Sequence, residues 1–183
     1  MEKRPDVTLA EIKKAFYALR NGIVADALRK QGSPYKFIFG LNLPQIAEIA
    51  SRYDKSAELA MLLLNNATSR ESQMMAAMVC PDGFITAESA IQWISQCVSR
   101  EAVDVFCLKQ LRDKTIANKI ISIGKSSDNN LTRYAVLRLM LRGLPDNIER
   151  AENYAQEELE KDCPITRFAS NQLINEIAFI KAQ

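Results

Sequence analysis

The side chains that could carry chemistry in this chain are carboxylates, arginines and cysteines, because the sequence contains no histidine. The lack of histidine excludes a Ser-His-Asp triad, a Cys-His pair and a His-ligated zinc site. The four cysteines show no Cys-x-x-Cys spacing, and two of them, Cys97 and Cys107, lie among apolar residues. We therefore interpret the cysteines as small buried hydrophobic side chains, and we expect no metal and no cofactor.

Asp104 is a carboxylate in unusual surroundings, since it lies within the apolar run of residues 102–108. A charged group in such a run needs a partner or access to a groove. One interpretation is an ion pair with Arg100, which precedes Asp104 by four residues and would lie on the same helix face. The other interpretation gives Asp104 a role in a concave binding site.

Basic residues gather in the middle of the chain. The segment from Lys109 to Arg142 holds eight lysines and arginines against two aspartates, whereas residues 146–162 are mostly acidic. The whole chain is nearly neutral, with 24 Lys+Arg, 22 Asp+Glu and a net charge of +2, so any nucleic-acid site has to be local. The asymmetry predicts a middle region that faces phosphates. An ordinary solvated helical surface is the alternative.

Apolar residues recur at helical spacing, and the elements that position these side chains are therefore predicted to be helices. A first helix is predicted to run to the Gly32–Pro34 break, with an apolar face of Leu9, Ile12, Phe16, Leu19 and Ile23. Capping boxes are predicted at Thr8–Glu11 and Thr68–Glu71. Further helix starts are predicted at Asn42 with Pro44, at Thr86 and at Ser99.

The pattern as a whole predicts an all-α fold of about ten helices, since only residues 35–39 could be extended. Successive short helices with tight turns are typical of HEAT or armadillo stacks. We predict a single domain over residues 1–183, a right-handed α-solenoid of HEAT/ARM-like antiparallel helix pairs. A compact helical bundle is the alternative. The residues expected to be buried are Leu9, Phe16, Ile49, Leu62, Met75, Ile94, Val103, Leu137 and Ile177.

The protein is also expected to be cytoplasmic. No signal peptide is recognised at its start, and no apolar run reaches the length of a membrane span. A reducing compartment agrees with the interpretation of the cysteines as unpaired thiols.

Three stretches between residues 35 and 140 resemble one known family when they are taken in order. They are Phe39-Gly40 with Pro44 and residues 46–50; Glu58-Leu59-Ala60 with Ser69-Arg70-Glu71 and residues 74–77; and Trp93-Ile94 with Val103-Asp104 and residues 133–137. Together they resemble the AlkD-like DNA alkylation repair family of DNA glycosylases, which has a HEAT-like fold. The resemblance implies that Asp104, as a catalytic residue, and Arg133 lie beside a damaged nucleotide, together with tryptophan side chains.

The chain departs from that family at one position that bears on chemistry. Arg100 stands where the family carries its site tryptophan, and the only tryptophan in this chain is Trp93. Aromatic faces hold a cationic alkylated base, whereas Arg100 would repel it. We therefore predict little or no glycosylase activity on alkylated purines. Trp93 is either an aromatic site residue or, at its helical spacing from Ile94 and Cys97, a core residue.

Two classes of function follow from the sequence. The first is a HEAT-like protein that binds double-stranded DNA through its phosphates without reading the sequence. Its contact residues would be Arg100, Lys109, Arg112, Arg133 and Arg138. The second is a non-catalytic scaffold that presents a concave helical surface to a protein partner. No membrane or metal partner is expected in either case.

Overall fold

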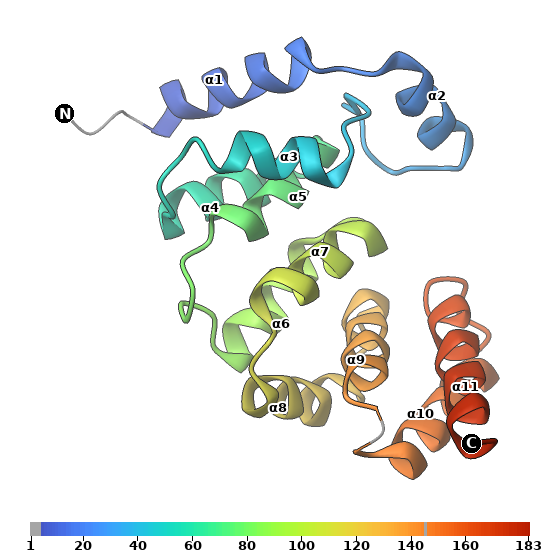
Figure 1. The fold of residues 1–183 in the computed structure, drawn as a ribbon. Helices are drawn as coiled ribbons and strands as arrows, with labels where there is room; N and C mark the ends of the chain where they lie inside the picture. Colours follow the sequence, from blue (N-terminus) through green and yellow to red (C-terminus); the bar gives the residue numbers. More distant parts are fainter. Residues whose placement is uncertain (1–4, 145) are drawn as a thin grey trace. The chain divides into compact units, whose positions relative to one another are not determined.

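The computed structural model of the protein describes residues 5–144 and 146–183. Over these residues the chain forms eleven helices, and the one extended contact is an isolated parallel bridge between Phe37 and Ser69 (Figure 1). The predicted all-α class is confirmed. Residues 35–39, which the sequence left as the one extended candidate, contribute a single bridge and no regular strand.

Contacts group the chain into two compact units. The first joins Met1–Phe84 to Gln96–Gln110, and the second joins Ile85–Ser95 to Leu111–Gln183. The helices of the first unit are α1 (Pro5–Ala18), α2 (Gly22–Lys30), α3 (Leu43–Ala50), α4 (Ala57–Asn65), α5 (Arg70–Val79) and α7 (Arg100–Gln110). The second unit holds α6 (Ala87–Gln96) apart from its last residue, with α8 (Lys114–Gly124), α9 (Asn130–Arg142), α10 (Ile148–Glu160) and α11 (Arg167–Lys181).

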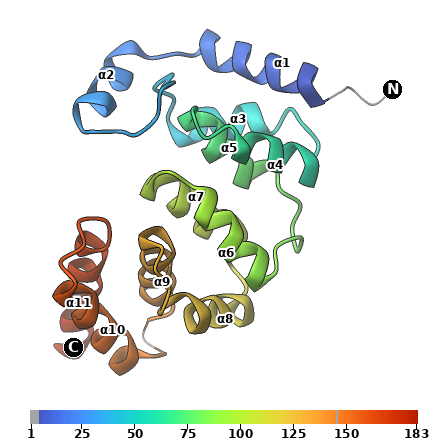
Figure 2. The same ribbon diagram turned by 180° about the vertical axis from the view of Figure 1, so that it is seen from behind.

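Helix α5 is the centre of the first unit. It contacts α3, α4 and α7 (Figure 2). All its residues except Met78 are buried, including the charged pair Arg70 and Glu71. A helix that is surrounded in this way buries side chains on every face, and its polar residues then need partners inside the protein. The polar side chains of α5 are therefore expected to form hydrogen bonds with neighbouring elements of the first unit.

The predicted first helix is in fact two helices, and this prediction was wrong. Helix α1 ends at Ala18, and Asn21 starts α2 by accepting a hydrogen bond from the backbone N of Val24 at 3.2 Å. The backbone N of Asn21 also donates to the carbonyl oxygen of Phe39 at 2.8 Å. Ile23, assigned to the apolar face, is 85% exposed as a result. The Thr8–Glu11 capping box was also wrong, because α1 already begins at Pro5.

Other predicted helix starts are confirmed. Asn42 and Gln45 form a reciprocal capping box at α3, with Pro44 in the first turn. The Ser99 hydroxyl accepts from the backbone N of Ala102 at 3.2 Å and so caps α7. The Thr86 hydroxyl accepts from the backbone N of Ser89, also at 3.2 Å. These caps join residues three apart in sequence, so local pattern alone identifies them.

The expected core is largely confirmed. Phe16, Ile49, Met75, Ile94, Val103, Leu137 and Ile177 are buried, while Leu9 and Leu62 are half-buried. In the second unit α9 contacts α8, α10 and α11, and its buried residues include Tyr134 to Leu137. Within the described ranges, no helix combines the length and the apolar character needed to cross a membrane.

Candidate functional site

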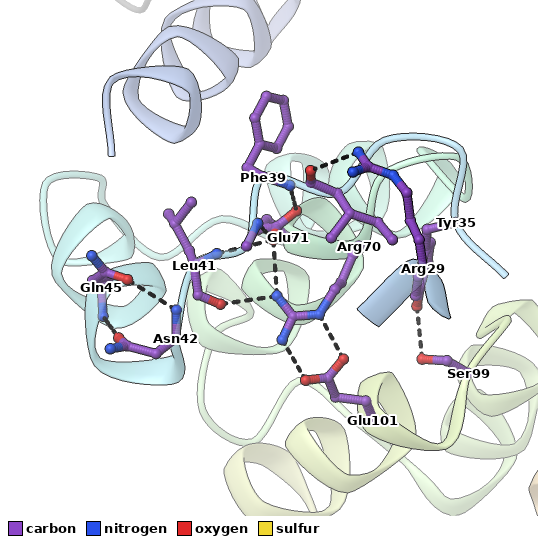
Figure 3. A network of polar contacts seen from close by, with 12 residues as sticks. Arg29, Tyr35, Phe39, Leu41, Asn42, Gln45, Arg70, Glu71, Ser99 and Glu101 are labelled. Carbon is purple, nitrogen blue, oxygen red and sulfur yellow. Dashed lines mark hydrogen bonds and ion pairs between the residues drawn. The ribbon is translucent and has the colours of Figure 1, made fainter. Parts of the chain in front are cut away.

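A buried network of polar contacts connects α5, α7 and the segment between α2 and α3 in the first unit (Figure 3). The Arg70 Nε donates to Glu101 at 2.7 Å, and its Nη1 donates to Glu71 at 2.8 Å and to the carbonyl of Leu41 at 2.9 Å. Burial opposes the charge of Arg70, but the hydrogen bonds and negative charges of the two glutamates outweigh it and raise the Arg70 pKa.

The Glu71 carboxylate fixes the course of the chain before α3. It accepts hydrogen bonds from the backbone N of Phe39, Gly40 and Leu41 at 3.1, 3.0 and 3.3 Å. The predicted capping box of Thr68 and Glu71 was therefore wrong: Ser69 is the N-cap of α5, and Glu71 binds a distant segment. Because the charges of Arg70 and Glu71 are engaged and buried, this network is structural and leaves Arg70 unavailable to a phosphate.

A basic pocket lies among α8, α9 and α10 in the second unit and has a volume of about 230 Å³. Its floor is apolar and includes Ala117, Ile121, Leu139, Met140 and Ala151, which are all buried. Its rim carries four exposed cations, Arg112, Lys114, Arg142 and Arg150, and a single carboxylate, Asp146. The rim thus contributes three net positive charges in a chain whose total is only +2.

The charged side chains of the basic pocket are exposed to solvent, so a ligand in solution can reach them. Lys114 Nζ lies 3.0 Å from Asp146 Oδ2, but the two side chains are 84% and 59% exposed, so this ion pair is weak. The Nη2 atom of Arg142 donates a hydrogen bond to the carbonyl oxygen of Leu111. Arg142 is nevertheless exposed at the rim of the basic pocket.

The start of α10 adds to the positive potential of the basic pocket. Asn147 is the N-cap of α10 and lines the pocket, and its side chain makes no capping hydrogen bond. The first-turn N–H groups of a helix carry the positive end of its dipole. Side-chain cations and backbone dipole therefore favour the same kind of ligand, a small anion.

The predicted DNA-contact residues of the second unit have three different environments. Arg112 lines the basic pocket. Arg138 Nη1 donates to Gln172 Oε1 on α11 at 2.8 Å. The Arg133 side chain is only 11% exposed, with its Nε 3.1 Å from the buried Glu158 and its Nη1 donating to the carbonyl of Ser127 at 2.8 Å. These contacts hold the Arg133 side chain inside the protein and favour a structural role over contact with DNA.

The other predicted site residues lie outside the basic pocket. Arg100 is exposed at the start of α7, Lys109 is half-buried near its end, and Asp104 is half-buried between the buried Val103 and Val105, all in the first unit. Trp93 lies on α6 in the second unit and is 3% exposed, which corresponds to the core interpretation. Within the second unit, Arg133, Arg138 and Trp93 do not line the basic pocket with Arg112.

Sequence reasoning missed Arg150 as a site residue. It lies in the acidic segment 146–162, where its charge is outnumbered, and only the packing of α10 beside α9 places it at the rim with Arg112 and Arg142. Lys114 and Arg142 belonged to the basic middle segment, but nothing in their spacing distinguished them from the other cations there. The useful signal was the density of charge rather than any single residue.

Three of the four cysteines of the described residues are buried, and the fourth, Cys163, is half-buried. Cys80, Cys97 and Cys107 are buried, and burial raises the pKa of Cys80 to about 11 and that of Cys97 to about 12. Burial also opposes ionisation of Cys163, but hydrogen bonds from the backbone N–H groups of Ile165 and Thr166 outweigh it and lower the Cys163 pKa. Across residues 5–144 and 146–183, no three Cys, Asp or Glu side chains are placed to bind a metal together.

The basic pocket is accordingly the candidate functional site, chosen for its concavity, its exposed cations and its apolar floor. The AlkD-like resemblance remains a prediction from three short stretches of sequence. Comparisons of the chain with models of protein families, with curated proteins and with solved structures found no match.

Proposed function

We propose that this chain is a non-catalytic DNA-binding protein whose basic pocket contacts the phosphate backbone of double-stranded DNA. The observation that carries the proposal is the convergence of Arg112, Lys114, Arg142 and Arg150 around a single carboxylate. Long cationic side chains that contact phosphates position a protein on a duplex but carry no sequence information. Binding is therefore expected to be indifferent to sequence.

The size of the positive cluster sets the expected salt dependence. Neutralising about three or four phosphates releases the counterions condensed on them, so log K should fall with log salt at a slope of roughly −3. Such a contact is weak at physiological salt. The near-neutral charge of the whole chain agrees with a local contact rather than a long electrostatic footprint.

A right-handed solenoid of HEAT-like helix pairs is the finer architecture that we propose for the chain. Helices that follow one another contact each other in α4–α5, α8–α9 and α10–α11, which is the pairing that such a stack requires. A solenoid presents one helix of each pair on its inner surface. The basic pocket is lined by both α8 and α9, so the proposed DNA contact does not depend on that inner surface.

The test is a titration of a covalently closed duplex circle between about 50 mM and about 200 mM salt. Arg150→Gln should lower affinity several-fold and flatten the salt slope by about one unit, because one phosphate contact is lost. Arg167→Gln is the matched control: it removes the same charge from the same unit, at an exposed position on α11 away from the pocket. The control should bind like the wild type.

Two results would overturn the proposal. One is an absence of duplex binding by the wild type at low salt. The other is an equal loss of affinity in Arg150→Gln and Arg167→Gln, because that result would mean that net charge rather than the basic pocket determines binding.

A protein-binding scaffold is the second candidate function, and a specific observation favours it. The end of α1 and the start of α2 expose Tyr17, Leu19, Ile23 and Val24, with exposed fractions between 37% and 85%. Helix α2 buries only Ala25, which packs with Tyr35 and Ile38 in a small cluster. Exposed apolar side chains that gather in one segment are typical of a protein-interaction surface. Failure of DNA binding would make this the better proposal.

A further inference from the structure

The apolar floor of the basic pocket has no role in contact with the side of a duplex. A phosphodiester backbone that lies across the rim meets Arg112, Lys114 and Arg150, whereas the apolar floor lies beneath these cations. The floor residues Ile121, Leu139 and Met140 are no more than 6% exposed and surround a cavity of about 230 Å³. A cavity with a charged rim and an apolar floor suits a ligand with an anionic group and a small organic body.

The charge of the rim favours a dianion over a monoanion. Four cations and one carboxylate leave three net positive charges, and the start of α10 adds its dipole. A phosphate monoester carries a charge of about −1.5 to −2 at neutral pH because its second pKa is about 6. An internal phosphodiester carries one negative charge, as each backbone phosphate of DNA does. The rim is therefore better matched to a terminal phosphate than to an internal one.

The volume limits the organic body of the ligand. The cavity is smaller than the range of about 300–1,000 Å³ typical of sites for drug-sized ligands. One sugar phosphate is small enough for such a space, and a dinucleotide is not. The amides of Asn118 and Asn147 line the same pocket and offer donors and acceptors for sugar hydroxyl groups.

We infer that the basic pocket binds the phosphate monoester of a nucleotide at the end of a nucleic-acid strand, with the terminal sugar over the apolar floor. This inference rests on the proposed function, since it assigns a preferred part of the DNA to the same site. The rim cations hold the phosphate through charge-assisted hydrogen bonds, and Lys114 exchanges Asp146 for the ligand oxygen. A free nucleotide carries the same phosphate monoester.

The experiment compares hairpin DNA with a terminal phosphate, the same hairpin with a terminal hydroxyl, and a closed duplex circle. The phosphorylated hairpin, prepared with the phosphate at either its 5′ or its 3′ end, should bind about tenfold more tightly than the hydroxyl form, a difference of about 1.4 kcal/mol. Thymidine monophosphate should compete for the phosphorylated end, whereas thymidine should not. The preference should weaken as the pH falls through about 6, because the monoester then becomes a monoanion.

Asn118→Leu separates the cavity from the rim. The Asn118 side chain is exposed and lines the pocket, so leucine there leaves the charge unchanged and narrows the cavity without disturbing the core. The variant should lose the preference for a terminal phosphate, measured as the ratio of the affinities for the phosphorylated and the hydroxyl hairpin. Asn175→Leu, at an exposed position on α11, is the matched control and should keep the wild-type ratio.

The outcomes distinguish this inference from the proposed function. Equal affinity for phosphorylated and hydroxyl ends, with the circle still bound, overturns the inference and leaves the proposed function standing. Binding of phosphorylated ends without any binding of the circle supports the inference and overturns contact with the duplex backbone. Binding of thymidine monophosphate, but of neither form of the hairpin, overturns a strand end as the ligand and identifies a free nucleotide instead.

Discussion

At the scale of single residues, the same side chain has different roles according to its neighbours. Arg70 and Arg133 each bind a fully buried glutamate, Glu71 and Glu158 respectively, whereas Arg150 is exposed at the basic pocket. Residue type and local spacing do not reveal this difference. Glu158 lies 25 positions after Arg133, so only the packing of α10 against α9 brings them together.

Arg133→Ala should destabilise the protein rather than alter a binding site. The change leaves the buried Glu158 carboxylate with Lys161 as its remaining ion-pair partner, and breaking a buried pair costs about 3 kcal/mol. Arg150→Ala, which removes an exposed arginine of the pocket, should change stability by no more than about 0.5 kcal/mol. Urea denaturation of both variants measures the two free energies of unfolding.

A loss of DNA affinity in Arg133→Ala without a loss of stability would identify Arg133 as a DNA-contact residue after all. If Arg133→Ala unfolds at the wild-type urea concentration and also loses duplex affinity, its guanidinium acts on DNA and not on Glu158. The sequence alone allowed both roles, because a helical arginine among buried neighbours can hold a partner or line a groove.

At the scale of elements, the sequence predicted helices well where their signals are local. The caps at Asn42, Thr86 and Ser99 use partners within three residues, and they lie where the pattern indicated. The break between α1 and α2 was missed because the apolar spacing runs through it. That break depends on contacts of Asn21 with Phe39 and Gly40, which are far away in sequence.

Gly40→Ala should test how the segment before α3 is held against α2. Gly40 has φ +78°, and an added Cβ would lie 2.2 Å from the carbonyl oxygen of Asn21 and 2.9 Å from the backbone N of Ala25. Neither backbone atom can move without disturbing the cap of α2, so we expect a loss of about 3 kcal/mol or more. Gly83→Ala is the matched control, since Gly83 has φ +74° and nothing within 4 Å of the added Cβ.

The control isolates conformational strain from steric clash. Gly83→Ala should cost about 1–2 kcal/mol, the usual penalty for a left-handed alanine. Equal losses in the two variants, measured by urea denaturation, would mean that the segment before α3 shifts freely and does not depend on its contact with Asn21.

At the scale of the whole molecule, the sequence predicted the fold class and the rough location of positive charge. Three of the four rim cations, Arg112, Lys114 and Arg142, lie within the basic middle segment. The fourth could not be predicted, because charge summed along the chain does not reveal which side chains share a surface. The same limit applies to Trp93, whose burial depends on neighbours that local spacing does not identify.

The whole molecule is expected to bind DNA without releasing alkylated purines from it. The face of a tryptophan ring holds a cationic alkylated base most strongly, since cation–π attraction is best with tryptophan and requires the base to approach the ring closely. The chain has one tryptophan, and its side chain is 3% exposed. Arg100, which occupies the position of the site tryptophan in the AlkD-like resemblance, is exposed and carries the charge that repels such a base.

The measurement is the number of abasic sites formed in methylated plasmid DNA by the purified protein. Wild type and Asp104→Asn should both give the background of the plasmid alone, because Asp104 has no base held beside it on which to act. Both should retain salt-dependent duplex binding, since Asp104 belongs to the first unit and the basic pocket to the second. Robust excision by the wild type that disappears in Asp104→Asn would contradict this prediction. It would show that the chain holds the damaged base by a route other than an exposed tryptophan and that Asp104 is catalytic.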